Sequence, residues 1–461
     1  MITLDYNNMM EDFVKGGISK ADLKKVGEIG TKIYEFIEQR RKTDLGFIDL
    51  PYNQDEIVKE ILEYKEEMKD IEAFVLFGIG GSALGPMAVQ QALNSPHYNE
   101  LSREQRGGLP KLYIIDNVDP EKLSYLFEVI NPENCLFNVI SKSGTTSETM
   151  SQFMIIKEVL REKLGDDFKK NIVCTTDREN GNLIKIAKNE GYKTFYIPEN
   201  VGGRFSQLTP VGLLPAAFCG VDIKKLLEGA ASMDKICKSG DISKNPALVF
   251  AALSFLSIEY NKNIQIVMPY ADSLKYIADW YAQLWAESLG KKYDREGNIV
   301  NTGSTPVKAL GVTDQHSQLQ LYSEGPNDKI IIFLGVENYK REVTIPKAYE
   351  EIPSLSFLGG HTHSKLIKTE QLATEYALLK SEKLNMTITL NKVDESCLGA
   401  LLYFFELATA YTGELLNINA FDQPGVEESK NATYALFDRP GYESKKEEIL
   451  NAPQKKKEYV I

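Results

Sequence analysis

The sequence lacks several features of secreted, zinc-binding and nucleic-acid-binding proteins. Its five cysteines are odd in number and contain no Cys-x-x-Cys pair, so we predict neither a disulfide framework nor a zinc site. Positive charge is scarce, because 53 Lys and Arg residues face 65 Asp and Glu residues and leave a net charge of −12. A protein that binds a polyanion needs a basic surface. We therefore expect no nucleic-acid partner, and any anionic partner should be small.

Long hydrophobic runs are also absent. The opening segment, MITLDYNNMM, has neither the basic nor the apolar part of a secretion signal. No stretch reaches the roughly 18 uninterrupted apolar residues of a membrane-spanning helix. The longest apolar stretch, Leu398 to Tyr411, includes Glu406 and is better interpreted as a buried helix. With the scattered cysteines, this predicts a cytoplasmic protein that does not interact with membranes.

The 461 residues have an ordinary globular composition and two patterns of hydrophobic spacing. Apolar residues recur every three to four positions through about the first 70 residues, which predicts helices. Short apolar runs then alternate with helical stretches, as in βαβ units. The runs lie at 73–78, 111–116, 135–141, 171–176 and 193–198, and again at 264–269, 329–335 and 386–391. Helices are predicted between them, including 147–163, 273–289 and 369–384.

This rhythm predicts an α/β protein with two doubly wound αβα sandwich domains and mainly parallel sheets. We place a helical N-terminal segment at 1–70, the first domain at 71–235 and the second at 236–415. A helical C-terminal segment, 416–461, carries Lys430. Ligands of such sheets bind outside the carboxyl ends of the strands. The loops that follow the predicted strands are therefore the candidate sites.

The loop after the first predicted strand contains Gly78-Ile79-Gly80-Gly81-Ser82-Ala83 and matches a dinucleotide-binding pattern. That pattern also needs an acidic residue about 20 positions on. The candidate, Asp116, lies 38 positions after Gly78, which disfavours a nicotinamide cofactor. Backbone N–H groups and the Ser82 hydroxyl could still bind an anion at a helix N-terminus. The alternative is a tight turn without a ligand.

The loop after the third predicted strand is rich in hydroxyl groups. It reads Ser141-Lys142-Ser143-Gly144-Thr145-Thr146-Ser147-Glu148 and precedes a predicted helix. Many hydrogen-bond donors at a helix N-terminus form a cradle for phosphate. A capping box that uses Glu148 is the alternative, but it explains only two of these residues. We predict a phosphate site here.

Three further positions could support acid–base chemistry. Arg204 follows two glycines, so its charge can approach a developing oxyanion. Gln283 and Glu287 are four residues apart and share a helix face. Glu287 lies in the last turn, where the helix dipole disfavours a carboxylate, and this suits a general base. The alternatives are a surface loop arginine and a solvated surface glutamate, both of which are commoner.

Histidines are few, at positions 97, 316, 361 and 363, and they suggest no metal site. His316 is a candidate general acid or base, by elimination among the four histidines only. Lys430 lies near the start of a predicted helix, where a positive charge is unfavourable, which suggests a function. The stretch from Lys291 to Pro326 looks like a long loop, and a loop of that length is usually functional.

Taken together, these motifs resemble the phosphoglucose isomerases, specifically the bacterial form. GIGGSALG, SKSGTTSET and NVGGRFSQLTPVG are followed by Gln283 and Glu287, by Gln315-His316 and by DQPGVEESK. The resemblance spans 357 of 461 positions, from Phe74 to Lys430. It implies two sugar-isomerase (SIS) type domains, a homodimer, and interconversion of glucose 6-phosphate and fructose 6-phosphate without metal or cofactor.

The resemblance also implies roles for individual residues. Glu287 matches the base that moves a proton between C1 and C2 through a cis-enediol, and Arg204 matches the residue that stabilises the enediolate. His316 and Lys430 match the pair that assists ring opening, with the histidine supplied by the partner chain. The remaining matches are the phosphate ligands Ser82, Ser141, Ser143 and Thr146, with Lys142 nearby, and the sugar-lining residues Gly81 and Gln423.

Two other functions remain open from the sequence. One is a non-catalytic regulator that binds a sugar phosphate through SIS domains, which would need the phosphate loops but not Glu287, His316 and Lys430 together. A fused DNA-binding module would be expected in such a regulator, and none is visible. The other is the isomerase domain of an amidotransferase, which would need a glutaminase portion longer than the first 70 residues.

Overall fold

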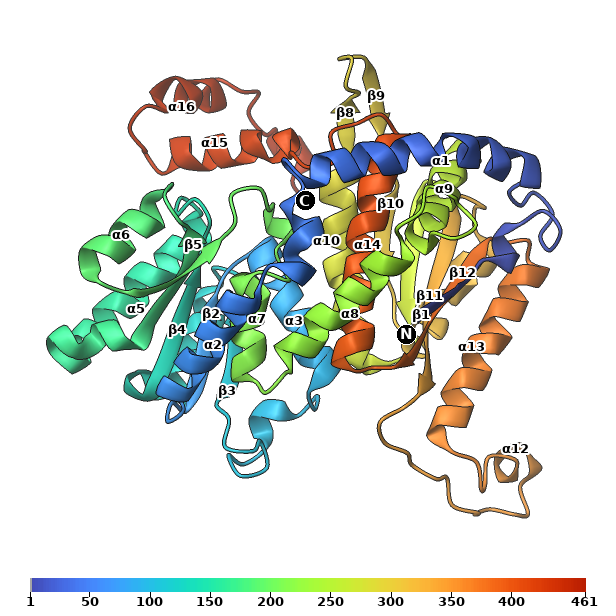
Figure 1. Ribbon diagram of the computed structural model, residues 1–461, viewed down its shortest axis with the longest axis horizontal. Helices are drawn as coiled ribbons and strands as arrows, with labels where there is room; N and C mark the ends of the chain where they lie inside the picture. Colours follow the sequence, from blue (N-terminus) through green and yellow to red (C-terminus); the bar gives the residue numbers. More distant parts are fainter. Residues whose placement is uncertain (1) are drawn as a thin grey trace.

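Two five-stranded sheets, one in each half of the molecule, organise the computed structural model, which describes residues 2–461 (Figure 1). The first sheet has the order β3-β2-β4-β5-β6, and all its neighbouring strands are parallel. Its strands are β2 (Ala73–Phe77), β3 (Lys111–Ile115), β4 (Cys135–Ile140), β5 (Ile172–Asp177) and β6 (Lys193–Ile197). All five lie where apolar runs predict strands.

Helices cover both faces of the first sheet, which explains why its central strands are apolar at successive positions. Val75 and Phe77 pack with one set of helices, α4, α5 and α6. Phe74 and Leu76 point the other way, toward α2, α3 and α7. The helices are α2 (Asp55–Glu67), α3 (Leu84–Leu93), α4 (Pro120–Val129), α5 (Ser147–Leu164), α6 (Asn182–Glu190) and α7 (Pro210–Phe218).

The second sheet has the order β1-β12-β11-β7-β10. Its strands are parallel except for β1, which runs antiparallel to β12. They are β1 (Ile2–Asp5), β7 (Ile264–Pro269), β10 (Thr305–Lys308), β11 (Lys329–Asn338) and β12 (Asn385–Lys392). One face packs on α11 (Leu319–Glu324) and α13 (His363–Lys380). Two doubly wound, mainly parallel sheets confirm the predicted fold class.

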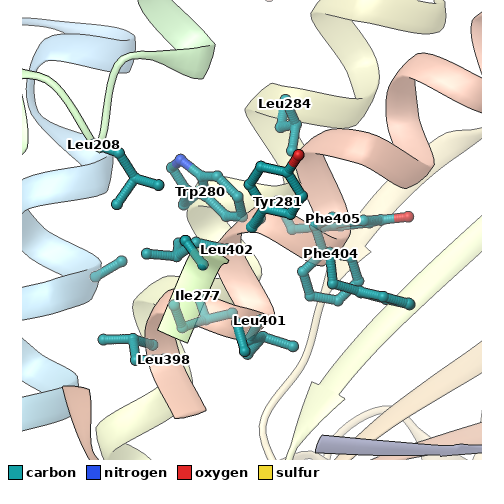
Figure 2. Packing of buried hydrophobic residues seen from close by; sticks show 14 of the residues in the cluster. Leu208, Ile277, Trp280, Tyr281, Leu284, Leu398, Leu401, Leu402, Phe404 and Phe405 are labelled. Carbon is teal, nitrogen blue, oxygen red and sulfur yellow. The ribbon is translucent and has the colours of Figure 1, made fainter. Parts of the chain in front are cut away.

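The inner faces of the two sheets share one hydrophobic core. It includes α1 (Lys20–Arg41), α8 (Ile223–Ile236), α9 (Pro246–Glu259), α10 (Lys275–Leu289) and α14 (Glu395–Leu415). Figure 2 shows Trp280 and Tyr281 of α10 against Leu402 and Phe405 of α14. Burying each such side chain contributes about 1.5–3 kcal/mol. Helix α10, which carries Glu287, is therefore held rigidly between the two halves.

The N-terminal segment departs from the helical expectation at its start. Helices α1 and α2 form as predicted, but Ile2–Asp5 is the edge strand β1, in which Leu4 pairs with Ile388 of β12. Four residues are too few to show a strand period among helical neighbours. The pairing joins residues more than 380 positions apart in the sequence, so local pattern did not indicate it.

The stretch predicted as a long loop, Lys291 to Pro326, is largely ordered into short elements. β8 (Lys291–Tyr293) and β9 (Ile299–Thr302) form a hairpin that projects from the body in Figure 1. β10 then pairs with β7 at the sheet edge, and α11 follows. The loop interpretation is therefore wrong. These strands are only three or four residues long, and most of their residues are exposed, so they lack the apolar run that marks a buried strand.

Two predicted helices differ in their limits or context. The helix predicted at 369–384 runs from His363 to Lys380 as α13, because the Thr362 side chain accepts a hydrogen bond from the Lys365 N–H and caps the helix earlier. Helix α14 extends the predicted buried helix at both ends. The domain boundary near residue 235 stays a prediction, and α8, just before it, packs mainly on α14.

The C-terminal segment is helical, as predicted. α15 (Glu427–Leu436) and α16 (Glu443–Leu450) lie beside the first sheet in Figure 1. The Tyr434 hydroxyl of α15 donates to the Thr145 carbonyl at 3.4 Å. This contact places α15 next to the hydroxyl-rich loop. Within residues 2–461, no helix has the length and apolar character needed to cross a membrane.

Candidate active site

A cavity of about 520 Å³ opens at the carboxyl ends of the first sheet's strands, where ligands of parallel sheets are expected. Loops that follow four of the five strands line it, together with Gln423 from the segment before α15. Its lining residues are Ile79, Ser82, Ile140, Ser141, Lys142, Ser143, Thr146, Thr149, Asp177, Asn180, Gly181, Glu199, Gly203 and Gln423. Six of the residues singled out from the sequence are therefore brought together: Ser82, Ser141, Lys142, Ser143, Thr146 and Gln423.

The hydroxyl-rich loop is folded around its own donors. The Ser141 and Thr146 hydroxyl oxygens lie 3.2 Å apart, and the Ser141 hydroxyl accepts the Gly144 N–H at 3.0 Å. The Ser143 and Thr145 hydroxyls are 2.7 Å apart. Thr146 is the N-cap of α5, but its side chain makes no capping hydrogen bond. The N-terminus of α5 therefore keeps backbone donors for an anion.

Gly81 has a packing role that explains its residue type. A Cβ atom at this position would collide with the backbone of Gly203 and Arg204. The loop after β2 can thus touch the loop after β6 only because residue 81 is glycine. Gly81 itself is not among the residues that line the cavity. Its role is to let the loop that carries Ser82 touch the loop that carries Arg204.

The Lys142 side chain lies along the cavity wall. Its ammonium group donates to the carbonyls of Glu199 at 2.6 Å and Val201 at 3.0 Å. Burial lowers the Lys142 pKa, an effect that Asp177 and Glu199 oppose. The lysine therefore ties the hydroxyl-rich loop to the loop after β6.

Arg204 is almost fully buried, with 4% of its surface exposed, so it is not the surface loop arginine of the alternative interpretation. Its Nε donates to the Ser288 hydroxyl at 2.7 Å, and Nη1 donates to Gln423 Oε1 at 3.0 Å. Nη2 donates to the carbonyls of Ala420 and Asp422. Burial lowers the Arg204 pKa, while Glu287 and Asp422 act in the opposite direction. Every nitrogen of the guanidinium therefore donates a hydrogen bond to a protein oxygen.

Glu287 lies beside that guanidinium. Its Oε1 is 3.5 Å from Arg204 Nη1, and its Oε2 accepts a hydrogen bond from Gln283 Nε2 at 3.0 Å. The side chain is 26% exposed, so it is partly buried and not a fully solvated surface glutamate. Gln283 and Glu287 share a helix face, as their spacing predicts. The carboxylate is held at both oxygens and can still be reached by a ligand.

His316 and Lys430 do not join the cavity within one chain. His316 is exposed in the turn after β10, on the second sheet. Its neighbour Gln315 is fixed by the Tyr270 hydroxyl at 2.6 Å. Lys430 is half-exposed on α15 and pairs with Glu427 at 2.8 Å. The contact between Tyr434 and Thr145 keeps the Lys430 helix near the hydroxyl-rich loop, whereas nothing in the described part of one chain brings His316 there.

The structure adds residues that the sequence analysis missed. Thr149 lines the cavity, and its buried hydroxyl has no hydrogen-bond partner within residues 2–461. It follows Thr146 by three residues in a helix, a spacing that could have identified it. Ser288 holds Arg204, and Lys291 caps the end of α10, but neither belongs to a pattern that marks a site. Among residues 2–461, no three His, Cys, Asp or Glu side chains are gathered as metal ligands.

The sequence matches the model of the family described as phosphoglucose isomerase over residues 63–449. It is 51% identical to a glucose-6-phosphate isomerase of Carboxydothermus hydrogenoformans over 452 residues, which cover 97% of each chain. It is 39% identical to a glucose-6-phosphate isomerase of Methanocaldococcus jannaschii over 95% of this chain and 100% of that protein.

Solved structures show the same fold. A hypothetical protein from Thermus thermophilus superimposes with a TM-score of 0.84 at 35% identity, over 95% of this chain and 100% of that one. A glucose-6-phosphate isomerase from Chlamydia trachomatis superimposes with a TM-score of 0.80 over 97% of this chain and 91% of that one. At 21% identity, the second likeness supports the fold alone.

Proposed function

The chain belongs to the phosphoglucose isomerase family and is an aldose–ketose isomerase, and from that premise we propose how its cavity interconverts glucose 6-phosphate and fructose 6-phosphate. The reaction is a step of glycolysis and gluconeogenesis. One observation supports the assignment most directly. A partly buried carboxylate, Glu287, lies 3.5 Å from the buried cation Arg204, which in turn bonds Gln423, a residue that lines the same cavity as the hydroxyl-rich loop.

The chemistry needs one base and one electrostatic stabiliser. Glu287 takes the proton from the carbon next to the carbonyl and returns it to the neighbouring carbon through a cis-enediol or enediolate. A positioned base contributes about 10² to 10⁴ in rate. Arg204 faces the oxyanion that develops, and a preorganised donor there contributes about 10² to 10³ more. The Gln283 side chain orients Glu287, and no redox cofactor or metal takes part in this mechanism.

The phosphate group is assigned to the other side of the cavity. Ser82, Ser141, Ser143 and Thr146 supply hydroxyl donors around the N-terminus of α5, with Lys142 along the wall. The buried Thr149 hydroxyl, which lacks a partner within residues 2–461, adds a fifth. Gln423 lines the cavity and accepts a hydrogen bond from Arg204. It can therefore contact the sugar between the phosphate loop and the pair of Glu287 and Arg204. Binding energy from the phosphate then holds the open chain in line with Glu287.

Ring opening is assigned to Lys430 and His316 in a homodimer. Lys430 is carried by α15, which contacts the hydroxyl-rich loop through Tyr434, and we assign it to the substrate bound in the same subunit. His316 faces outward from the second sheet, far along the chain from the cavity residues. We assign it to the partner subunit's cavity, where it would act as proton donor or acceptor to the ring oxygen. A two-fold dimer would exchange the two histidines symmetrically.

A non-catalytic sugar-phosphate regulator is the alternative, and it is not favoured, because the similar proteins named above are isomerases. Cytoplasmic location is part of the proposal and agrees with five free, buried cysteines.

The test is direct. Purified protein is mixed with fructose 6-phosphate, and glucose 6-phosphate formation is followed by a coupled assay with and without EDTA. The same turnover in both mixtures is expected. No turnover would contradict the proposal, and loss with EDTA that a divalent metal restores would replace proton transfer by a metal-assisted hydride shift.

A further inference from the structure

Lys291, which the proposed mechanism does not use, lies at the C-terminal end of the helix that carries Glu287. Its ammonium group donates to the carbonyls of Glu287 and Ser288, both at 2.8 Å. These carbonyls belong to the last turn of α10, where a helix has no partners of its own for them. The lysine side chain is only 5% exposed. A buried cation therefore caps the turn from which the Glu287 carboxylate projects.

The same turn also fixes Arg204. The Ser288 hydroxyl accepts Arg204 Nε at 2.7 Å, while the Ser288 carbonyl accepts the Lys291 ammonium. A shift of this backbone would thus move Glu287 and Arg204 together. Lys291 is also the first residue of β8, so it joins the last turn of α10 to the projecting hairpin.

Electrostatics give the lysine a second effect. Lys291 Nζ is 3.7 Å from Asp422 Oδ1, and Arg204 donates to the Asp422 carbonyl. Two cations, Arg204 and Lys291, therefore balance two carboxylates, Glu287 and Asp422. Burial and the charge of Arg204 lower the Lys291 pKa, while Asp422 and Glu287 oppose this. Removal of the lysine charge would leave the group with a negative excess at the negative end of a helix dipole.

We propose that Lys291 is a positioning residue for the isomerisation. It holds the last turn of α10, and with it Glu287 and Arg204, and it supplies one of the two positive charges that balance Glu287 and Asp422. This inference rests on the proposed function, because it assigns Lys291 a role in the reaction of that same site.

The test compares Lys291→Met with wild-type enzyme. A reacting group misplaced by about 1 Å can cost 10²-fold in rate, so kcat should fall about 10- to 100-fold, with KM changed less than about threefold. The acid limb of the kcat/KM profile should move to higher pH, because the buried group of charges loses one of its two cations. Arg204, which faces Glu287, and Asp422, which pairs with Lys291 in the wild type, both remain in the variant.

Two matched variants distinguish the effect of the Lys291 charge and its position on catalysis from an effect on folding. Lys291→Arg keeps the charge and should recover most of kcat and return the acid limb toward that of the wild type. Lys292→Met removes the same charge one residue further along the hairpin, where the side chain is exposed, and should behave as wild type. Thermal unfolding of every variant is measured. If Lys291→Met does not fold, Lys291→Gln, which keeps a hydrogen-bond donor but no charge, takes its place.

Each outcome has one meaning. Wild-type kcat and an unmoved acid limb in Lys291→Met would overturn the proposal. A lower melting temperature with an unmoved acid limb and normal kcat would do so too, because it would make Lys291 a structural cap only. An acid limb that moves equally in Lys292→Met would assign the effect to general surface charge and overturn the proposal as well. Wild-type enzyme and Lys292→Met without turnover would contradict the proposed function itself, a result distinct from failure of the Lys291 variant alone.

Discussion

Glu287 receives a hydrogen bond from Gln283 and faces Arg204, and in the proposed reaction its carboxylate has to accept a proton. Glu287→Gln keeps the shape and the neighbours but cannot accept that proton. We expect kcat to fall at least about 10²-fold, while KM stays close to the wild-type value. Steady-state kinetics measure both. Asp279→Asn, on the same helix and paired with Lys308, is the control and should retain turnover. A Glu287→Gln variant with more than about one tenth of wild-type kcat would remove Glu287 as the base.

The hydroxyls of Ser141 and Thr146 contribute to substrate binding in this proposal. Their contacts to phosphate are present in both the ground state and the transition state, so their loss should raise KM more than it lowers kcat. Hydrogen bonds to a charged group contribute about 1.5–3 kcal/mol each, so Ser141→Ala with Thr146→Ala should raise KM about tenfold or more. Ser151→Ala, whose hydroxyl bonds the Glu148 carbonyl, is the control. An unchanged KM in the double variant would place the phosphate elsewhere.

Glu406 is a carboxyl group in the centre of the core. It is fully buried, and neither oxygen has a hydrogen-bond partner in the described part of the chain. Burial raises the Glu406 pKa well above its usual value. Above about pH 4.3, the unfolded chain therefore releases a proton that the folded protein keeps. Stability falls by up to about 1.4 kcal/mol for each pH unit in that window.

Glu406→Gln removes this pH-dependent cost. We expect the melting temperature of the variant, relative to that of the wild type, to increase as the pH rises from 5 to 8. Thermal unfolding at each pH measures this difference. Glu414→Gln on the same helix should do the opposite and lower stability at neutral pH, because Glu414 is 5% exposed and pairs with Arg40 and Arg295. Parallel melting curves for Glu406→Gln and wild type across this range would show that Glu406 is ionised in the folded protein.

At the scale of elements, the proposed active site depends on how closely two loops approach. The loop after β2 and the loop after β6 meet at Gly81 and Gly203. In Gly81→Ala, the new methyl group would meet the backbone of Gly203, which cannot move aside without displacing Arg204. We expect a loss of kcat of about 10²-fold, measured together with the melting temperature.

A glycine in an ordinary helical position provides the control for that variant. At Gly27, inside α1, a Cβ would meet only the side chain of Ile242, 3.0 Å away. Gly27→Ala should therefore keep normal turnover, and alanine also favours the helix. If Gly81→Ala were as active as Gly27→Ala, close approach of the two loops would not be needed for the site.

At the scale of the whole molecule, the proposed site needs two chains. His316→Ala and Glu287→Gln should each be nearly inactive. Mixed under conditions that let subunits exchange, they form heterodimers in which one cavity carries both defects and the other carries neither. Activity should then rise toward about half of the wild-type value per heterodimer. Subunit exchange is verified independently, for example with differently tagged chains. No recovery after proven exchange would place His316 in its own subunit's site or outside the site.

The local order of elements followed from the sequence. Buried parallel strands are apolar on both faces, so β2, β4, β5, β7 and β11 were visible as short runs between helical stretches. The loops that follow β2 and β4 could be recognised because glycines and hydroxyl residues gather there. The pair Gln283 and Glu287 could be placed on one helix face because the helical period is fixed by the backbone.

Tertiary structure decided which of these pieces meet. Edge strands β1 and β10 make contacts far along the chain and have no buried run of their own, so local pattern did not indicate them. The environment of Glu287 depends on Arg204, which lies 3.5 Å away, and on Asp422, which contacts Arg204 and Lys291. Both come from segments far along the chain from α10 and meet it only by packing. The position of His316, exposed on the second sheet, was likewise decided by the folded chain. The sequence by itself determined which groups could perform the chemistry, because residue type and spacing are local, but only the folded chain decided their distances, burial and balance of charge.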